Sequence, residues 1–92
     1  MAIKFLSASV ASTNYSAITA PTFVIPFIPK FFRIVTAPGS TLAMRVSFDG
    51  VGDDGRVDLG VTPKTFIQQV TNVWVKQETG GGAQTVYLEA EA

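Results

Sequence analysis

Hydrophobic and polar side chains alternate along much of the chain after residue 40, and this pattern constrains the fold more than any other feature. The alternation is clearest in residues 41–48 and 86–91, where every second side chain is hydrophobic. A period of two residues is typical of a β-strand with one buried face, and no window shows the 3.6-residue period of a helix. The sequence therefore predicts an all-β fold, a small antiparallel β-sandwich or barrel of jelly-roll-like type, with an extended N-terminal arm.

Three further runs, residues 31–37, 65–70 and 72–77, are rich in β-branched and aromatic side chains and are expected to be strands. The first of them is apolar on both faces, with Phe32 and Ile34 on one side and Phe31 and Val35 on the other. Such a strand is either central in a sandwich or covered by another chain.

Glycine and proline mark the expected turns. Ala37–Ser40 has proline at the second turn position. Gly80–Gly82 is expected to form the tip of a hairpin between the last two strands. If the valines of both strands share the buried face, the register of this hairpin places Trp74 opposite Tyr87 on the exposed face.

Residues 1–30 lack this pattern and are expected to form the N-terminal arm, which leaves residues 31–92 as the β-sandwich domain. The segment carries two charged side chains, both lysine, and three prolines interrupt its apolar end. Prolines at this spacing exclude a helix or a central strand. Two arrangements stay open: the arm lies along another chain, or it folds back as the first strands of the same sandwich. In the first arrangement, Ser7–Ala20 extends toward the other chain and Phe23–Phe32 binds it.

Composition excludes several function classes for a chain of 92 residues. A domain of this size buries only about 60–65% of its unfolded surface, and the chain has no cysteine or histidine for a disulfide or a common zinc site. Oligomerisation, or docking onto a larger body, is the remaining source of additional stability, so a homo-oligomer is expected. Seven basic and seven acidic residues cancel, which argues against nucleic-acid binding. The apolar runs are too short for a membrane span or a secretion signal.

Four aspartates form the one cluster that resembles a ligand site: Asp49, Asp53, Asp54 and Asp58. Their oxygens could hold calcium, but their spacing does not match an EF-hand loop. Aspartate and glycine are also favoured turn residues, so a solvated loop is the preferred interpretation and calcium is the alternative.

Little in the sequence supports catalysis. No histidine is present to activate a serine or threonine, and Gly80–Gly82 lacks the lysine and hydroxyl partner of a phosphate-binding loop. We therefore expect no enzyme activity, no catalytic residue, no metal and no cofactor. The expected pair of Trp74 and Tyr87 would suit a sugar-stacking platform or, as the favoured interpretation, a subunit contact or packing within the chain.

Five segments together resemble a known group of proteins: Phe32–Gly39, Met44–Gly50, Pro63–Phe66, Val73–Lys76 and Val86–Leu88. They resemble small β-sandwich virion proteins of tailed bacteriophages, over roughly residues 31–90. The resemblance implies a capsid decoration (cement) protein, assembled into the virion in the host cytoplasm. It also implies a homo-oligomer, with a trimer favoured, that binds the major capsid protein or another virion protein. A small head–tail or tail protein is the alternative, and a carbohydrate-binding module is the second.

The residues expected to make these contacts are the apolar part of the arm and the exposed aromatics: Phe23, Val24, Ile25, Phe27, Ile28, Phe31, Trp74 and Tyr87.

Overall fold

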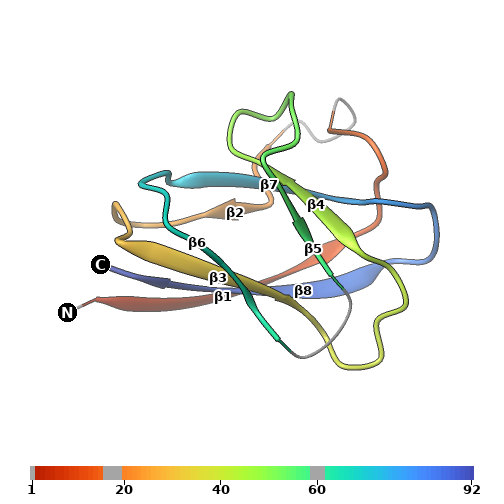
Figure 1. Ribbon diagram of the computed structural model, residues 1–92, viewed down its shortest axis with the longest axis horizontal. Helices are drawn as coiled ribbons and strands as arrows, with labels where there is room; N and C mark the ends of the chain where they lie inside the picture. The colour runs from red at the N-terminus through yellow and green to blue at the C-terminus, as the bar shows by residue number, and fades with distance from the viewer. Residues whose placement is uncertain (1, 16–19, 59–61) are drawn as a thin grey trace.

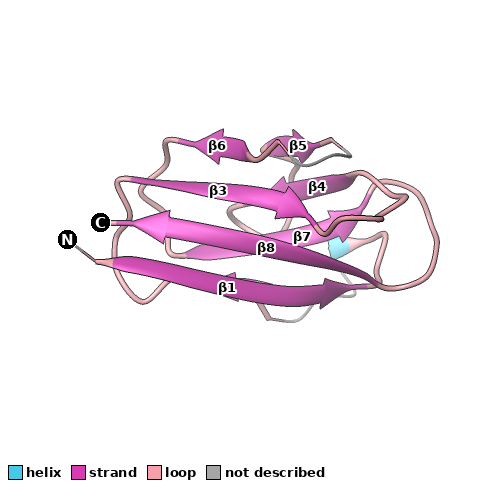
Figure 2. Cartoon of the chain, turned by 90° about the horizontal axis from the view of Figure 1, so that it is seen from below, coloured by secondary structure: helices cyan, strands magenta, loops and turns pink. Residues whose placement is uncertain are grey.

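The computed structural model describes residues 2–15, 20–58 and 62–92, and these form a β-sandwich without an α-helix (Figure 1). The eight strands are β1 (Ile3–Val10), β2 (Phe23–Val24), β3 (Phe31–Thr36), β4 (Met44–Ser47), β5 (Gly55–Val57), β6 (Lys64–Phe66), β7 (Asn72–Gln77) and β8 (Gln84–Glu91). They form two four-stranded antiparallel sheets, which confirms the predicted fold class. We call β1-β8-β3-β6 the front sheet, nearest the viewer in Figure 2, and β2-β7-β4-β5 the back sheet.

The strand pairs are nested. β1 pairs with β8, β2 with β7, β3 with β6 and β4 with β5, and successive pairs fall alternately in the front and back sheets. A ribbon of antiparallel pairs wrapped in this way, with eight strands in two sheets, is a jelly roll. The strand order therefore defines the fold as a jelly roll.

The hairpin predicted between the last two strands is wrong. β7 lies in the back sheet and β8 in the front sheet, so the chain crosses between the layers through the segment that contains Gly80–Gly82. Stacked sheets are about 10 Å apart, which a connection of several extended residues spans easily. The valines of both strands do face the core, as expected, but Trp74 and Tyr87 extend from opposite sheets and do not oppose each other.

The expected division into an arm and a separate domain is also wrong for the described part of residues 1–30. β1 pairs with β8 over its whole length, from Ile3 opposite Glu91 to Val10 opposite Gln84. Phe23 and Ile25 are each only 2% exposed and belong to the core. The segment folds back as the first strands of the sandwich, because its inward side chains find buried positions between the two sheets.

A cluster of three phenylalanine rings connects the two sheets near the C-terminal end of β4. The rings of Phe32 and Phe66 are stacked with centroids 5.3 Å apart, and Phe48 meets both edge-on at 5.9 and 5.8 Å. β3, which contributes Phe32, lies between β8 and β6, so the strand predicted to be apolar on both faces is central. The turn after it forms as expected, with Ser40 N donating to Ala37 O at 3.1 Å and Gly39 at φ 85°.

Gly55 provides a test of this packing, because a Cβ there would lie 2.5 Å from Cε1 of Phe66. The ring packs against Phe32 and Phe48, so moving it aside would disturb both contacts. We expect Gly55→Ala to destabilise the fold by about 1–3 kcal/mol in chemical denaturation. Gly52→Ala is the matched control, since a Cβ at Gly52 meets nothing within 4 Å. Equal unfolding free energies for the two variants would contradict the packing.

Candidate functional site

The outer face of the front sheet carries a group of hydrophobic side chains beside polar ones such as Ser7, Thr85 and Glu91. Its exposed or half-buried hydrophobic side chains come from β1, β8, β3 and the residue after β6: Ile3, Phe5, Phe31, Val35, Ile67 and Tyr87. We call this set the front face. Phe5 is 70% exposed, Ile67 81% and Tyr87 43%. An antiparallel sheet with one solvated face normally has polar side chains there, so the front face departs from the expected pattern.

One ion pair lies at the centre of the front face. Arg33 on β3 is opposite Glu89 on β8, and Arg33 Nη1 lies 3.2 Å from Glu89 Oε1. The guanidinium carbon is also 4.7 Å from the centroid of the Phe31 ring. Both side chains are more than one-third exposed, so the pair mainly orients the arginine and adds little stability.

Two shallow hollows flank Arg33. The first, of about 210 Å³, is lined by the ion pair together with Phe5, Leu6, Val35, Pro63, Tyr87 and Leu88. The second, of about 320 Å³, lies between Lys30, Phe31, Arg33, Thr65 and Ile67. Both are open to solvent and lined mainly by apolar atoms. This geometry suits the protruding apolar side chains of a macromolecular partner better than an enclosed small molecule.

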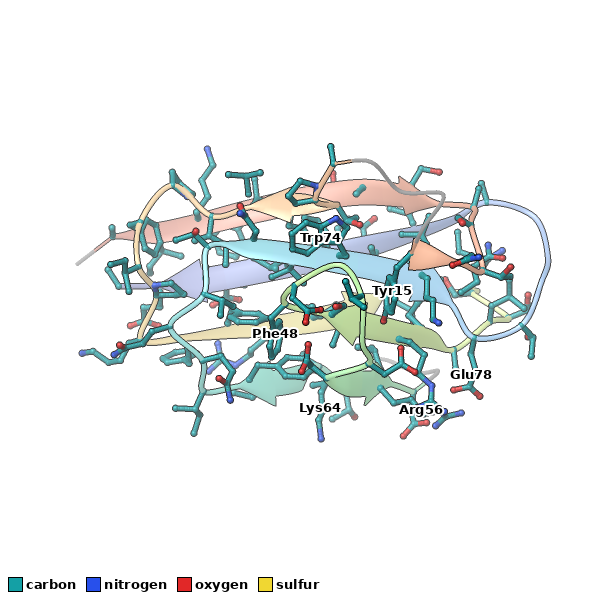
Figure 3. The ribbon with its side chains drawn as sticks, turned by 90° about the horizontal axis from the view of Figure 1, so that it is seen from above. Tyr15, Phe48, Arg56, Lys64, Trp74 and Glu78 are labelled. Atoms are coloured by element: carbon teal, nitrogen blue, oxygen red, sulfur yellow. The ribbon has the colours of Figure 1, made fainter. Side chains whose placement is uncertain are left out.

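The outer face of the back sheet is different, because the β4–β5 loop covers part of it. The indole of Trp74 (Figure 3) packs against Gly50, where a Cβ would lie 3.0 Å from the ring, so that a larger residue would require the ring or the loop to shift. Gly50 also has φ 79°, a conformation that favours glycine. Ser47 Oγ accepts a hydrogen bond from Gly50 N at 2.9 Å and holds the loop down. Trp74 is therefore not an exposed platform, and it cannot share one with Tyr87.

The aspartates have separate roles in this loop and beside it. Asp49 Oδ1 accepts hydrogen bonds from Val51 N at 2.9 Å and Gly52 N at 3.1 Å, and these lower the pKa of its carboxyl. Asp54 Oδ2 accepts from Phe48 N at 2.8 Å.

The other two aspartates pair with basic side chains. Asp53 lies 3.6 Å from Lys76 Nζ, and Asp58 pairs with Arg56. Within the described residues, no three His, Cys, Asp or Glu side chains gather as a metal site. The contacts therefore assign these carboxylates to turn formation and ion pairing.

Tyr15 packs against the same region. Lys76 Nζ lies 4.4 Å from the centroid of its ring. Burial, followed by the nearby Asp53 carboxylate, strongly raises the pKa of its phenol, which stays protonated throughout the physiological range.

A row of cations crosses the back sheet. Arg45 on β4 is opposite both Lys76 on β7 and Arg56 on β5. Like charges directly opposite one another destabilise a sheet. Glu78 relieves this repulsion, because its Oε2 accepts from Arg45 Nε at 2.9 Å and from Arg56 Nε at 2.5 Å. Arg56 and Glu78 lie together at one end of the sandwich (Figure 3). The hydrogen bond from Arg56, more than any other contact, lowers the pKa of Glu78.

The structure separates the residues that the sequence analysis expected to act together. Phe23 and Ile25 are in the core and cannot contact a partner, and Phe27 packs against that core. Val24 and Ile28 are exposed but lie outside the two hollows. Only Phe31 and Tyr87 belong to the front face.

The sequence analysis did not include four members of the front face among the expected contact residues: Ile3, Phe5, Val35 and Ile67. Phe5 has no clear signal in the sequence, because apolar side chains in residues 3–10 occur at odd and even positions alike and do not show which face is buried. Ile67 follows the short strand β6 and has no comparable signal in the sequence.

Comparison of the chain with protein-family models, curated proteins and solved structures finds no match. Within the described residues, no helix has the length and hydrophobicity needed to cross a membrane.

The Glu78 contacts predict a specific dependence on pH. A carboxyl whose pKa is lower in the folded state stabilises the fold above its unfolded value, here 4.5, and loses that contribution as pH falls through the folded pKa. We expect Glu78→Gln to lower the melting temperature at pH 7, and we expect its difference from the parent chain to shrink below about pH 4.

The control is Glu91→Gln, which makes the same change in charge at a carboxylate without an ion pair among the described residues. A melting-temperature difference for Glu78→Gln that stays constant from about pH 3 to 7 would contradict the assignment.

Proposed function

We propose that the chain is a structural protein of a tailed-bacteriophage virion, a capsid decoration (cement) protein that docks through the front face and stabilises the shell. It is not an enzyme in this proposal and needs no cofactor. The observation that carries the proposal is the bare apolar front face of a sheet whose other side already forms the core.

The contrast between the two outer faces supports a docking role. The back sheet carries the row of cations with their carboxylate partners and is partly covered by the β4–β5 loop. The front sheet has one central ion pair surrounded by exposed hydrophobic side chains. Contiguous apolar patches of this kind usually mark sites of interaction. Burying a Phe or Ile side chain contributes about 1.5–3 kcal/mol before the costs of association.

Two observations support the assignment to a virion. The segments that resemble phage virion proteins lie largely on β3, β4, β7 and β8, the inner strands of the two sheets. The jelly roll is also a common architecture of viral capsid domains, although lectins and cupins share it. A shared architecture does not by itself specify a function, so the proposed docking role rests on the front face.

The mechanism is mechanical. A protein that binds the assembled shell in preference to free subunits shifts the equilibrium toward the shell by mass action. Each copy contributes a modest binding free energy, and the many copies on a virion multiply the effect. The major capsid protein is the proposed partner, and a tail or head–tail protein is the alternative.

Ile67→Asp tests the front face directly. We expect this variant to bind empty capsid shells of the encoding phage at least about tenfold more weakly in a cosedimentation assay, because a charge would be buried at the interface. Val51→Asp is the matched control, since Val51 is 82% exposed, as Ile67 is 81% exposed, but lies in the β4–β5 loop.

Binding that both variants retain equally would overturn the role of the front face. Binding of the parent chain to isolated tails but not to shells would reassign it to the alternative position. Binding to neither would refute the virion proposal.

A further inference from the structure

The four sheet edges of this protein are protected unequally. Exposed edges invite pairing with other chains, and proteins commonly blunt them with very short strands, prolines, charges or bulges. β2 has two residues and lies between Pro21 and Pro26. β5 and β6 have three residues each, and Pro63 precedes β6. Three of the four edges are therefore blunted in recognised ways.

β1 is the least protected of the four edges. It has eight residues and no proline, and its one charged side chain, Lys4, lies near its beginning. Its register with β8 runs without interruption, so no bulge twists it away. β1 forms the margin of the front sheet in Figure 2, and within the described part of the chain only β8 pairs with it.

The hydrogen-bond pattern identifies the free backbone groups of β1. Ala92 N donates to Ala2 O at 2.9 Å, so the main chain of Ala2 points toward β8. In an antiparallel pair this direction alternates with each residue. The even residues of β1 therefore bond to β8, and Ile3, Phe5, Ser7 and Ser9 direct their N–H and C=O groups away from the sheet. The side chains of these four residues lie on the outer side of the front sheet.

We propose that β1 is a dimerisation edge, which pairs antiparallel with β1 of a second copy about a two-fold axis at Leu6. This register places Ile3 opposite Ser9 of the second copy and Phe5 opposite Ser7 of the second copy, so that every outward-directed N–H and C=O group finds a partner. Each pair joins residues on the same face of the sheet, which keeps the core side and the front face of both copies aligned.

Charge favours a second copy as the partner. In this register Lys4 lies opposite Ala8 of the second copy, so no like charges meet. The net charge of the chain is zero, so long-range repulsion between copies is weak. The two Phe5 rings are diagonal neighbours across the axis, within reach of each other.

The dimer joins two front sheets into one continuous sheet with a doubled front face. Pairing between identical edges is isologous and closes at two copies. The β1 edge therefore favours a dimer over the trimer that the resemblance to phage proteins implies. The dimer does not depend on a virion partner and goes beyond the proposed function.

Ser7→Pro tests the edge. Proline removes only an N–H that points away from β8, and its φ is tolerated at an edge strand, so the monomer is expected to fold. We expect the dimer dissociation constant, measured by sedimentation across a concentration series, to rise about tenfold or more, because both copies lose a hydrogen bond.

Ser7→Ala, the matched control, removes the side chain but keeps the N–H and should leave the dissociation constant nearly unchanged. A parent chain that stays monomeric at every concentration would overturn the proposal. So would a dimer that Ser7→Pro does not weaken.

Hydrogen exchange on the parent chain provides a test that needs no variant. The amides of Phe5, Ser7 and Ser9 should exchange slowly at high protein concentration and quickly on dilution, whereas those of Leu6 and Ala8 should stay protected throughout. The same rates at both concentrations would overturn the proposal. Ile67→Asp should leave this pattern intact, so that a failure of shell binding and a failure of dimerisation are distinguishable.

Discussion

The C-terminal strand β8 lies between β1 and β3, and the front sheet depends on these two pairings. β8 brings residues from the two ends of the chain together, as when Ile3 lies opposite Glu91. Its inner side chains, Val86, Leu88 and Ala90, are buried in the core, while Tyr87 and Glu89 belong to the outer surface. Alternate residues of β8 therefore contribute to the core and to the candidate site. Pairing over such sequence distances makes folding slow relative to a helical protein of the same size.

The alternation in the sequence was sufficient to predict which side chains face the core, but not which strands pair. Val75 and Val86 were correctly expected to be buried, yet they lie in different sheets. A period of two residues specifies a face, whereas pairing is decided by the packing of the whole chain. For β1 the sequence left two arrangements open, folding back into the sandwich or lying along another chain, because its small residues, such as Ser7 and Ala8, have a weak hydrophobic pattern. The pairing with β8 decides for the first.

The uneven distribution of charge gives the two outer faces different costs of being covered by a partner. Lys76, Arg45 and Arg56 are opposed across the back sheet and require nearby carboxylates, which the β4–β5 loop and Glu78 supply. These contacts occupy the back face with polar groups that would lose water if a partner covered them. The front face, with one central ion pair, has a lower desolvation cost. The same loop that covers Trp74 thus leaves the front sheet as the surface available for binding.

The two proposed contacts of the front sheet differ in what they would determine. Burial of apolar area on the front face would supply binding free energy but little orientation, since the hydrophobic effect is not directional. Main-chain hydrogen bonds along the β1 edge would determine register and direction but add modest net stability. Phe5 would participate in both, because its ring lies on the front face while its backbone lies at the free edge. A rigid pairing at the edge would hold two front faces in one orientation, so that a partner with repeated subunits could engage both at once.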